Sequence, residues 1–227
     1  MRFLALLTLP LTVGALALGC SEKRVSMAPG PREYVASDYS EVLERWTRQE
    51  SLVSIERLDD LLTVTATYES WDFRWAYVVR YARDYRLTVD QRRALLDTTL
   101  NDARGSHQFY VALYGGSNPR ATDISKPNSA WVVRLIDNLG NETAPSKIER
   151  IARPGALEHT YFPYTSPWRQ AFRITFPRSN PNGPSISEQS SWFGLRFAGA
   201  EGNKELRWEV EPATERASIE QRAISTF

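Results

Sequence analysis

The sequence is poor in the residues that most often carry chemistry. Its 227 residues include one cysteine, Cys20, and two histidines, His107 and His159. A chain of this length can bury a sizeable core without a disulfide or a metal ion. With 42% hydrophobic and 11% aromatic residues, the composition is that of a globular protein, which excludes disorder as the main state.

Neither sign of charge is in excess, because 28 Lys and Arg residues balance 27 Asp and Glu residues. Binding to nucleic acid requires a basic excess or a basic face, and a general attraction to anionic lipids requires a polybasic run. Neither is present, so no nucleic-acid partner is expected. The sequence also lacks a Walker loop and a dinucleotide fingerprint. We therefore expect neither a nucleotide ligand nor a cofactor.

The first residues, 1–19, form an apolar leader with a single charged residue, Arg2. The run is short for a spanning helix and contains a central proline, which is typical of a cleaved secretory signal peptide. It ends in Gly19 followed by Cys20. An ordinary leader cut nearby would leave one unpaired thiol, which is uncommon in an oxidising compartment.

The four residues Ala17-Leu18-Gly19-Cys20 resemble the lipobox of bacterial lipoproteins, although Ala17 replaces the usual Leu and Leu18 replaces the usual small residue. The resemblance implies cleavage before Cys20 and attachment of a diacylglycerol to its thiol. Multiple acyl chains anchor a protein stably, so the lipid would supply membrane attachment. Ser21, being a residue other than Asp, implies export to the outer membrane, with the protein facing the periplasm.

The mature chain is predicted to begin with a lipidated tether, residues 20–37, followed by a single domain, 38–212, and a polar tail, 213–227. The tether has Pro29, Gly30 and Pro31 at its centre and no periodic apolar face. Mostly extended, it could hold the domain several nanometres from the bilayer, at ~3.3 Å per residue.

The first part of the domain predicts a helix, a strand and a helical pair. Residues 38–48 show amphipathic helical spacing, and residues 61–69 alternate as a strand with one buried face. Ser70 is a predicted cap of a helix that carries an aromatic stripe at four-residue spacing. Thr88 and Gln91 form a capping box for the next helix. Together the two helices predict an αα-hairpin inserted over residues 71–104, after the first strand.

After Gly105 the sequence changes to short apolar stretches separated by turn residues. The predicted strands are His107–Tyr114, Ala130–Asp137, Ala144–Ile151, Arg169–Phe176, Ser191–Phe197 and Lys204–Val210. With the strand at 61–69 the count is seven. We therefore expect an α+β fold, mainly β, built as an immunoglobulin-like antiparallel β-sandwich that carries the helical insertion and a short N-terminal helix.

A search for reactive groups predicts no catalytic residue and no metal site. His107 and His159 lie outside any HExxH arrangement, and we interpret both as ordinary surface or half-buried residues. The segment 137–142 is rich in oxygen-bearing side chains and could ligate calcium. It lacks the twelve-residue calcium-loop pattern, so a hairpin turn is the favoured interpretation.

Aromatic residues are abundant, and four of them lie in a proline-rich region: Tyr161, Phe162, Tyr164 and Trp168. Rings on rigid loops can stack on sugar faces or anchor a protein partner. The competing interpretation is that these rings fill a gap between the sandwich and the helical pair. The sequence favours a non-catalytic binding or structural module whose partner is an envelope protein or glycan. The alternative is a periplasmic hydrolase whose catalytic residues converge only in the fold.

Overall fold

The structure is a computed structural model that describes residues 24–56, 58–116 and 122–211. The predicted leader, Cys20 and the predicted tail lie outside these residues. Within the described part of the chain, no helix is both long and apolar enough to cross a membrane.

Two antiparallel sheets form most of the fold. The first sheet has the order β1 (Thr47–Ser54), β2 (Asp59–Tyr68), β3 (Ser106–Tyr114), β7 (Gln170–Pro177) and β6 (Lys147–Ile151). The second sheet has the order β11 (Gly202–Glu209), β10 (Trp192–Gly199), β4 (Trp131–Asp137) and β5 (Glu142–Thr143). A short ladder pairs β8 (Ser179–Asn180) with β9 (Gly183–Pro184). The prediction of an α+β fold that is mainly β is confirmed.

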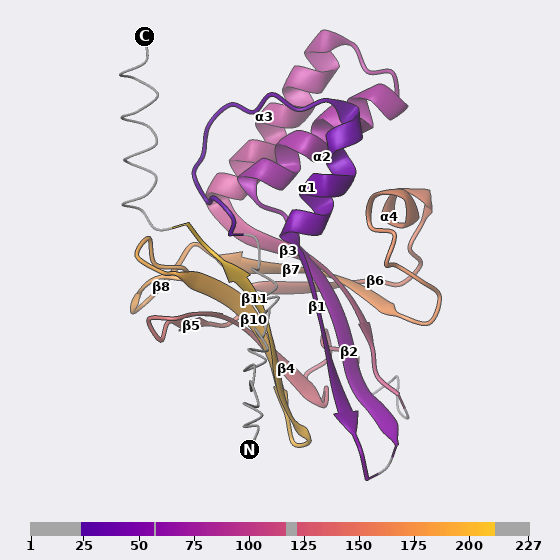
Figure 1. The fold of residues 1–227 in the computed structure, drawn as a ribbon, viewed down its shortest axis with the longest axis vertical. Coiled ribbons are helices and arrows are strands. Elements are labelled where there is room, and N and C mark those ends of the chain that lie inside the picture. Colours follow the sequence, from indigo (N-terminus) through magenta and orange to yellow (C-terminus); the bar gives the residue numbers. More distant parts are fainter. Residues whose placement is uncertain (1–23, 57, 117–121, 212–227) are drawn as a thin grey trace, which may run out of the picture.

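The α-helices of the described residues are α1 (Tyr39–Trp46), α2 (Trp71–Asp84), α3 (Val89–Gly105) and α4 (Ala156–Tyr161), with a 3-10 turn at Ala36–Asp38. Figure 1 shows α1, α2 and α3 together at one end of the sheets and α4 apart from them. The α2–α3 pair lies close to the predicted position. It follows the second strand rather than the first, because sequence analysis did not predict β1.

The helical pair begins where its capping residues predict. The Ser70 side chain accepts a hydrogen bond from the Phe73 backbone amide at 3.0 Å, which satisfies a free donor of the first turn of α2. At the start of α3, Thr88 Oγ1 accepts from the Gln91 amide, and the Gln91 side chain accepts from the Thr88 amide. These reciprocal bonds form the predicted capping box.

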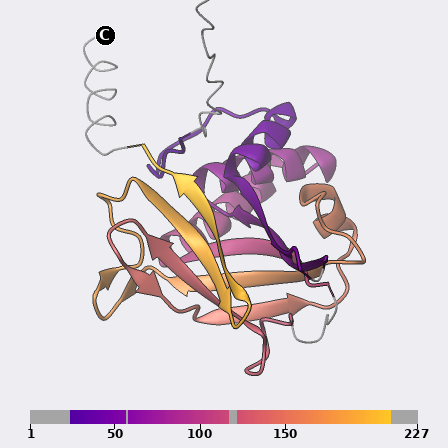
Figure 2. The same ribbon diagram turned by 60° about the horizontal axis from the view of Figure 1, so that its bottom comes forward.

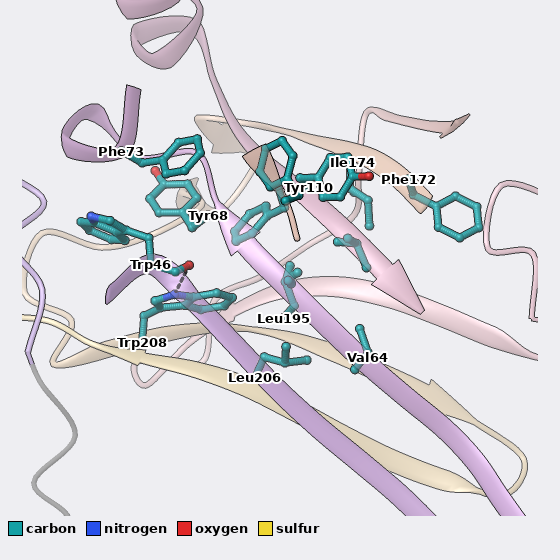
Figure 3. Close-up of a cluster of buried hydrophobic side chains, with 14 of the residues drawn as sticks. Trp46, Val64, Tyr68, Phe73, Tyr110, Phe172, Ile174, Leu195, Leu206 and Trp208 are labelled. Carbon is teal, nitrogen blue, oxygen red and sulfur yellow. Dashed lines mark hydrogen bonds between the residues drawn. The ribbon is translucent and has the colours of Figure 1, made fainter. Parts of the chain in front are cut away.

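The core lies between the inner faces of the two sheets and continues under α1 and α2 (Figure 3). Trp208 of β11 is fully buried and stacks on Phe193 of β10 with an interplanar angle of 8°. Its indole nitrogen donates to the Trp46 carbonyl oxygen at 3.0 Å (dashed in Figure 3). This bond joins the end of α1 to the second sheet, and the Trp208 ring also meets Phe109 of β3 at 5.6 Å, so one buried ring connects the helical layer to both sheets.

The predicted strand Ala144–Ile151 is shorter in the structure, where only Lys147–Ile151 forms a strand, β6, and residues 144–146 connect it to β5. The β5 pair ends at Thr143 and belongs to the second sheet, whereas β6 starts at Lys147 and pairs with β7 in the first sheet. Pro145 lies between them and has no amide hydrogen for a ladder bond. The chain therefore crosses from one sheet to the other at this proline.

Residues 24–35, which we call the strap, are packed on the domain, although they were predicted to be tether. Val25 is fully buried, and its amide donates to the Glu209 carbonyl oxygen at 2.8 Å. Further along, the Trp71 indole donates to the Gly30 carbonyl oxygen at 2.7 Å. Figures 1 and 2 show the strap running from the end of β11 to the helices.

A buried carboxylate at the start of α2 fixes the other end of the strap. Asp72 is 6% exposed, and its oxygens accept bonds from Arg32 Nε at 3.0 Å and from the Tyr34 hydroxyl at 2.5 Å. The same carboxylate accepts from Arg45 at 3.3 Å and from the Trp46 indole at 2.9 Å. Asp72 therefore links the strap, α1 and α2, and these charge-assisted bonds compensate for its burial.

Candidate functional site

The four aromatic residues predicted as ligand or partner contacts lie in two different environments. Tyr161 and Phe162 are 1% and 5% exposed, and Tyr164 is half-buried. Trp168, in contrast, is 82% exposed. Sequence reasoning treated the rings as one group, and only Trp168 is fully available to a ligand.

The other three rings pack between the first sheet and the helices. Phe162 stacks on Tyr110 of β3 with ring centroids 3.9 Å apart and an interplanar angle of 7°. Tyr161 meets Tyr77 of α2 edge to face at 4.9 Å, and Tyr164 lies 6.0 Å from Tyr110. For these three residues the competing interpretation, that the rings fill a gap, describes the structure.

Two consecutive turns present Trp168 to solvent. The Thr165 amide donates to the Phe162 carbonyl oxygen at 2.8 Å, and the Arg169 amide donates to the Ser166 carbonyl oxygen at 3.1 Å. Pro167 occupies the second position of the latter turn, where its fixed φ is favourable. The tryptophan therefore stands on a segment whose backbone is ordered by hydrogen bonds, next to the first residues of β7.

Trp168 borders a surface depression of about 870 Å³. The far wall comes from the end of β3 and from β6 with the segment that follows it. Apolar atoms of Tyr114, Ile151 and Pro154 contribute to the lining. The volume lies in the range of small-ligand sites, ~300–1,000 Å³.

Three cationic side chains line the same depression: Lys126, Arg150 and Arg169. Arg150 donates to the buried Asp123 carboxylate at 3.1 Å, and Arg169 donates to Thr65 Oγ1 at 2.7 Å. Each bond uses part of a guanidinium that carries five N–H donors, so both groups are oriented and still have donors for a ligand. Among the described residues of this lining, Asp123 is the single carboxylate beside three cations, so their charge balance is positive.

The depression combines aromatic and cationic side chains. Its described lining contains no histidine and no cysteine. It combines an exposed indole face with oriented arginines, which can hold a planar or ring-shaped ligand that carries an anionic group.

Neither histidine is among the described residues that line the Trp168 depression, and the two differ in exposure. His159 is exposed on α4, whereas His107 at the start of β3 is 3% exposed. The Tyr68 hydroxyl and His107 Nδ1 share a hydrogen bond of 2.8 Å. Burial, assisted by the nearby Arg178 charge, lowers the pKa of His107 to about 3. The interpretation of His107 as a surface or half-buried residue is therefore wrong.

The surroundings of His107 do not support the hydrolase alternative. His107 lines a cavity of about 480 Å³ together with Glu188 and Ser190. Ser190 donates its hydroxyl to Asp137 at 2.8 Å rather than to a histidine. A general base also works best with a pKa near the operating pH, and burial holds the His107 pKa far below that range.

The segment considered for calcium forms the hairpin turn between β4 and β5. Asp137 Oδ1 accepts from the Leu139 and Asn141 amides, each at 3.0 Å. Burial raises the pKa of Asp137, but donors from Asn141, Ser187 and Ser190 outweigh it and hold the pKa below its usual value. Hydrogen bonds from within the protein thus occupy the Asp137 carboxylate. No group of three or more potential metal ligands occurs within residues 24–56, 58–116 and 122–211.

Comparison of the chain with protein-family models, with curated proteins and with solved structures gives no match in any of the three cases.

Proposed function

We propose that the protein is a bacterial envelope lipoprotein, anchored by a lipid on Cys20 to the outer membrane and facing the periplasm. The leader, the lipobox-like residues and the sole cysteine support this proposal. The strap shortens the connection to the anchor, because Val25 is already packed on the domain. Val25 lies five positions after Cys20, and a chain of this length spans at most ~17 Å. The domain would therefore lie near the membrane surface, rather than several nanometres from it.

We also propose that the two sheets form an immunoglobulin-like sandwich. Such folds have strands A, B, E and D in one sheet and G, F and C in the other, with an added C′ in variable-type domains. If β2 is strand A, the order β2-β3-β7-β6 corresponds to A-B-E-D, and β11-β10-β4-β5 corresponds to G-F-C-C′. On this assignment β1 is an additional edge strand, and α2 with α3 is inserted between A and B.

We infer that the domain is a non-catalytic binding module for an envelope glycan that carries carboxylate groups. The observation that carries this proposal is the exposure of Trp168 at the edge of a cation-lined depression. A tryptophan exposed to this extent adds nothing to the core, and its indole face matches the apolar face of a sugar ring. A sugar carboxylate would then reach the guanidinium groups of Arg150 and Arg169.

The side chains that would contact the glycan are already oriented by contacts within the protein. Arg150 and Arg169 are oriented by Asp123 and Thr65, and the turn at Pro167 limits the motion of the Trp168 backbone. Ordering these groups therefore costs little when the ligand binds. A neutral protein partner would leave the positive charge balance of the depression uncompensated, which favours an anionic glycan.

The test is co-sedimentation of the full-length protein, extracted in detergent, with purified bacterial sacculi, whose glycan strands carry carboxylates. Trp168→Ala should weaken the apparent affinity about five- to thirtyfold, since stacking on a ring contributes on the order of 1–2 kcal/mol. Binding should also weaken with added salt, because the arginines contribute electrostatically.

Trp192→Ala is the matched control, since Trp192 lies on the other sheet and packs against Arg207 at 4.2 Å. This variant should bind as the wild type does. Equal sedimentation of Trp168→Ala and wild type, or no binding by wild type, would refute the proposed ligand class and the proposed site.

A further inference from the structure

Two cavities adjoin each other between the strap and the end of the sandwich near His107. The first has about 480 Å³ and the second about 350 Å³. Both are lined by Met27, Pro29 and Arg178, so we treat them as one compartment, the strap chamber. Each is within the size range of small-molecule sites.

Most of the strap chamber is apolar. Besides the strap residues, Ile186 and Val210 line its first part, and Trp71 and Ala103 line the second. Such a surface would bind a hydrocarbon chain in preference to a polar ligand, because burying apolar area is favourable.

One cationic side chain, Arg178, lies in the linings of both cavities. Arg178 is exposed, and the described residues provide no ion pair for it. Arginines elsewhere near the helices are compensated, as Arg32 and Arg45 are by Asp72. The guanidinium of Arg178 is therefore available to an anion that enters the chamber.

Two buried groups stand beside that guanidinium and keep a fixed geometry. The Tyr68 hydroxyl and His107 Nδ1 bond to each other at 2.8 Å, and both residues are 3% exposed. The nearby Arg178 charge disfavours protonation of His107 and partly offsets the rise that burial causes in the Tyr68 pKa. The charged residues of the two linings are Arg178 and Arg104 against Glu188, a positive balance.

We propose that the strap chamber binds an amphipathic carboxylate, a medium-chain fatty-acid anion, with its head at Arg178 and its chain among Met27, Ile186 and Val210. This site is separate from the Trp168 depression and does not depend on the glycan proposal. A neutral chain would lack the arginine contact, and a small polar anion would lack the apolar one.

The probe is decanoate with a diazirine at the end of its chain, photolysed in isolated membranes that carry the full-length protein. Labelling should map to peptides that contain Met27, Ile186 or Val210. An excess of unmodified decanoate should compete, whereas decanol should compete at least about tenfold less well, since a charge-assisted hydrogen bond contributes a factor of ten or more.

Arg178→Gln should reduce labelling at least about tenfold. Arg153→Gln is the control, because Arg153 is also exposed and lies outside both linings. Ile186→Trp, which fills the apolar part and keeps Arg178, should also abolish labelling. Limited proteolysis verifies that each variant is folded. Undiminished labelling in Arg178→Gln, labelling confined to other surfaces, or equal competition by decanol would overturn the proposal.

Discussion

The buried His107 should make the protein sensitive to mild acid. Its pKa is about 3 in the folded protein, against 6.5 for an unperturbed histidine, because burial and then the Arg178 charge disfavour the protonated ring. The unfolded chain therefore binds a proton more readily than the folded protein does in the range between these two values. The stabilising contribution is complete above the unfolded pKa and is lost progressively as the pH falls toward the folded pKa.

The magnitude follows from the two pKa values. Between about pH 7 and about pH 5, the linkage relation gives a loss of about 2 kcal/mol in the free energy of unfolding. Side chains such as Asp84, Asp137 and Glu205 have lowered pKa values, so their contributions are lost only in stronger acid. The interval down to about pH 5 therefore isolates His107.

The assay is urea unfolding, followed by tryptophan fluorescence, of wild type, His107→Asn and His159→Asn at both pH values. An asparagine amide takes the place of the Nδ1 that bonds to Tyr68, but it does not titrate. Whatever its stability at neutral pH, the His107→Asn variant should change little in stability on acidification. The exposed His159 serves as the control and its variant should keep the wild-type response. A drop of about 2 kcal/mol that persists in His107→Asn would refute the reasoning.

Two further predictions concern the strap and the anchor. Asp72→Asn should lower the free energy of unfolding by about 3 kcal/mol, because Arg32 and Arg45 lose the carboxylate that compensates them. Thermal melts should show no comparable change for the control Asp97→Asn, on the exposed side of α3. Equal melting temperatures of the two variants would contradict the role given to Asp72. Cys20→Ala should abolish both the lipid mass increase and the membrane location, as measured by intact mass and cell fractionation, whereas a wild-type protein found soluble and unmodified would contradict the lipoprotein proposal.

Local signals predicted some elements well. The caps at Ser70 and Thr88 placed the starts of α2 and α3, because a side chain that bonds to the first turn is a short-range feature. By contrast, β1 has alternating exposed and half-buried residues and a largely polar sequence. It is a strand because it pairs with β2, and that pairing cannot be read from its own residues.

Long-range packing also explains what sequence analysis missed in the candidate site. Tyr164 and Trp168 lie four residues apart in one proline-rich loop, yet one ring packs against β3 and the other reaches solvent. The same limit applies to His107, whose burial depends on the strap and on residues around Arg178. A sequence identifies a ring or an imidazole, but distant segments decide its exposure.

The pairing of Val25 with Val210 determines when, during synthesis and folding, the strap can dock on the domain. A polypeptide emerges with its N-terminus first, and the strap must wait for nearly the whole sequence before its partner exists. Contacts of such separation form late because they close the longest loop. Docking of the strap against Val210 is therefore a late step of folding, and on the proposed lipid anchor at Cys20 it would also draw the domain toward the membrane.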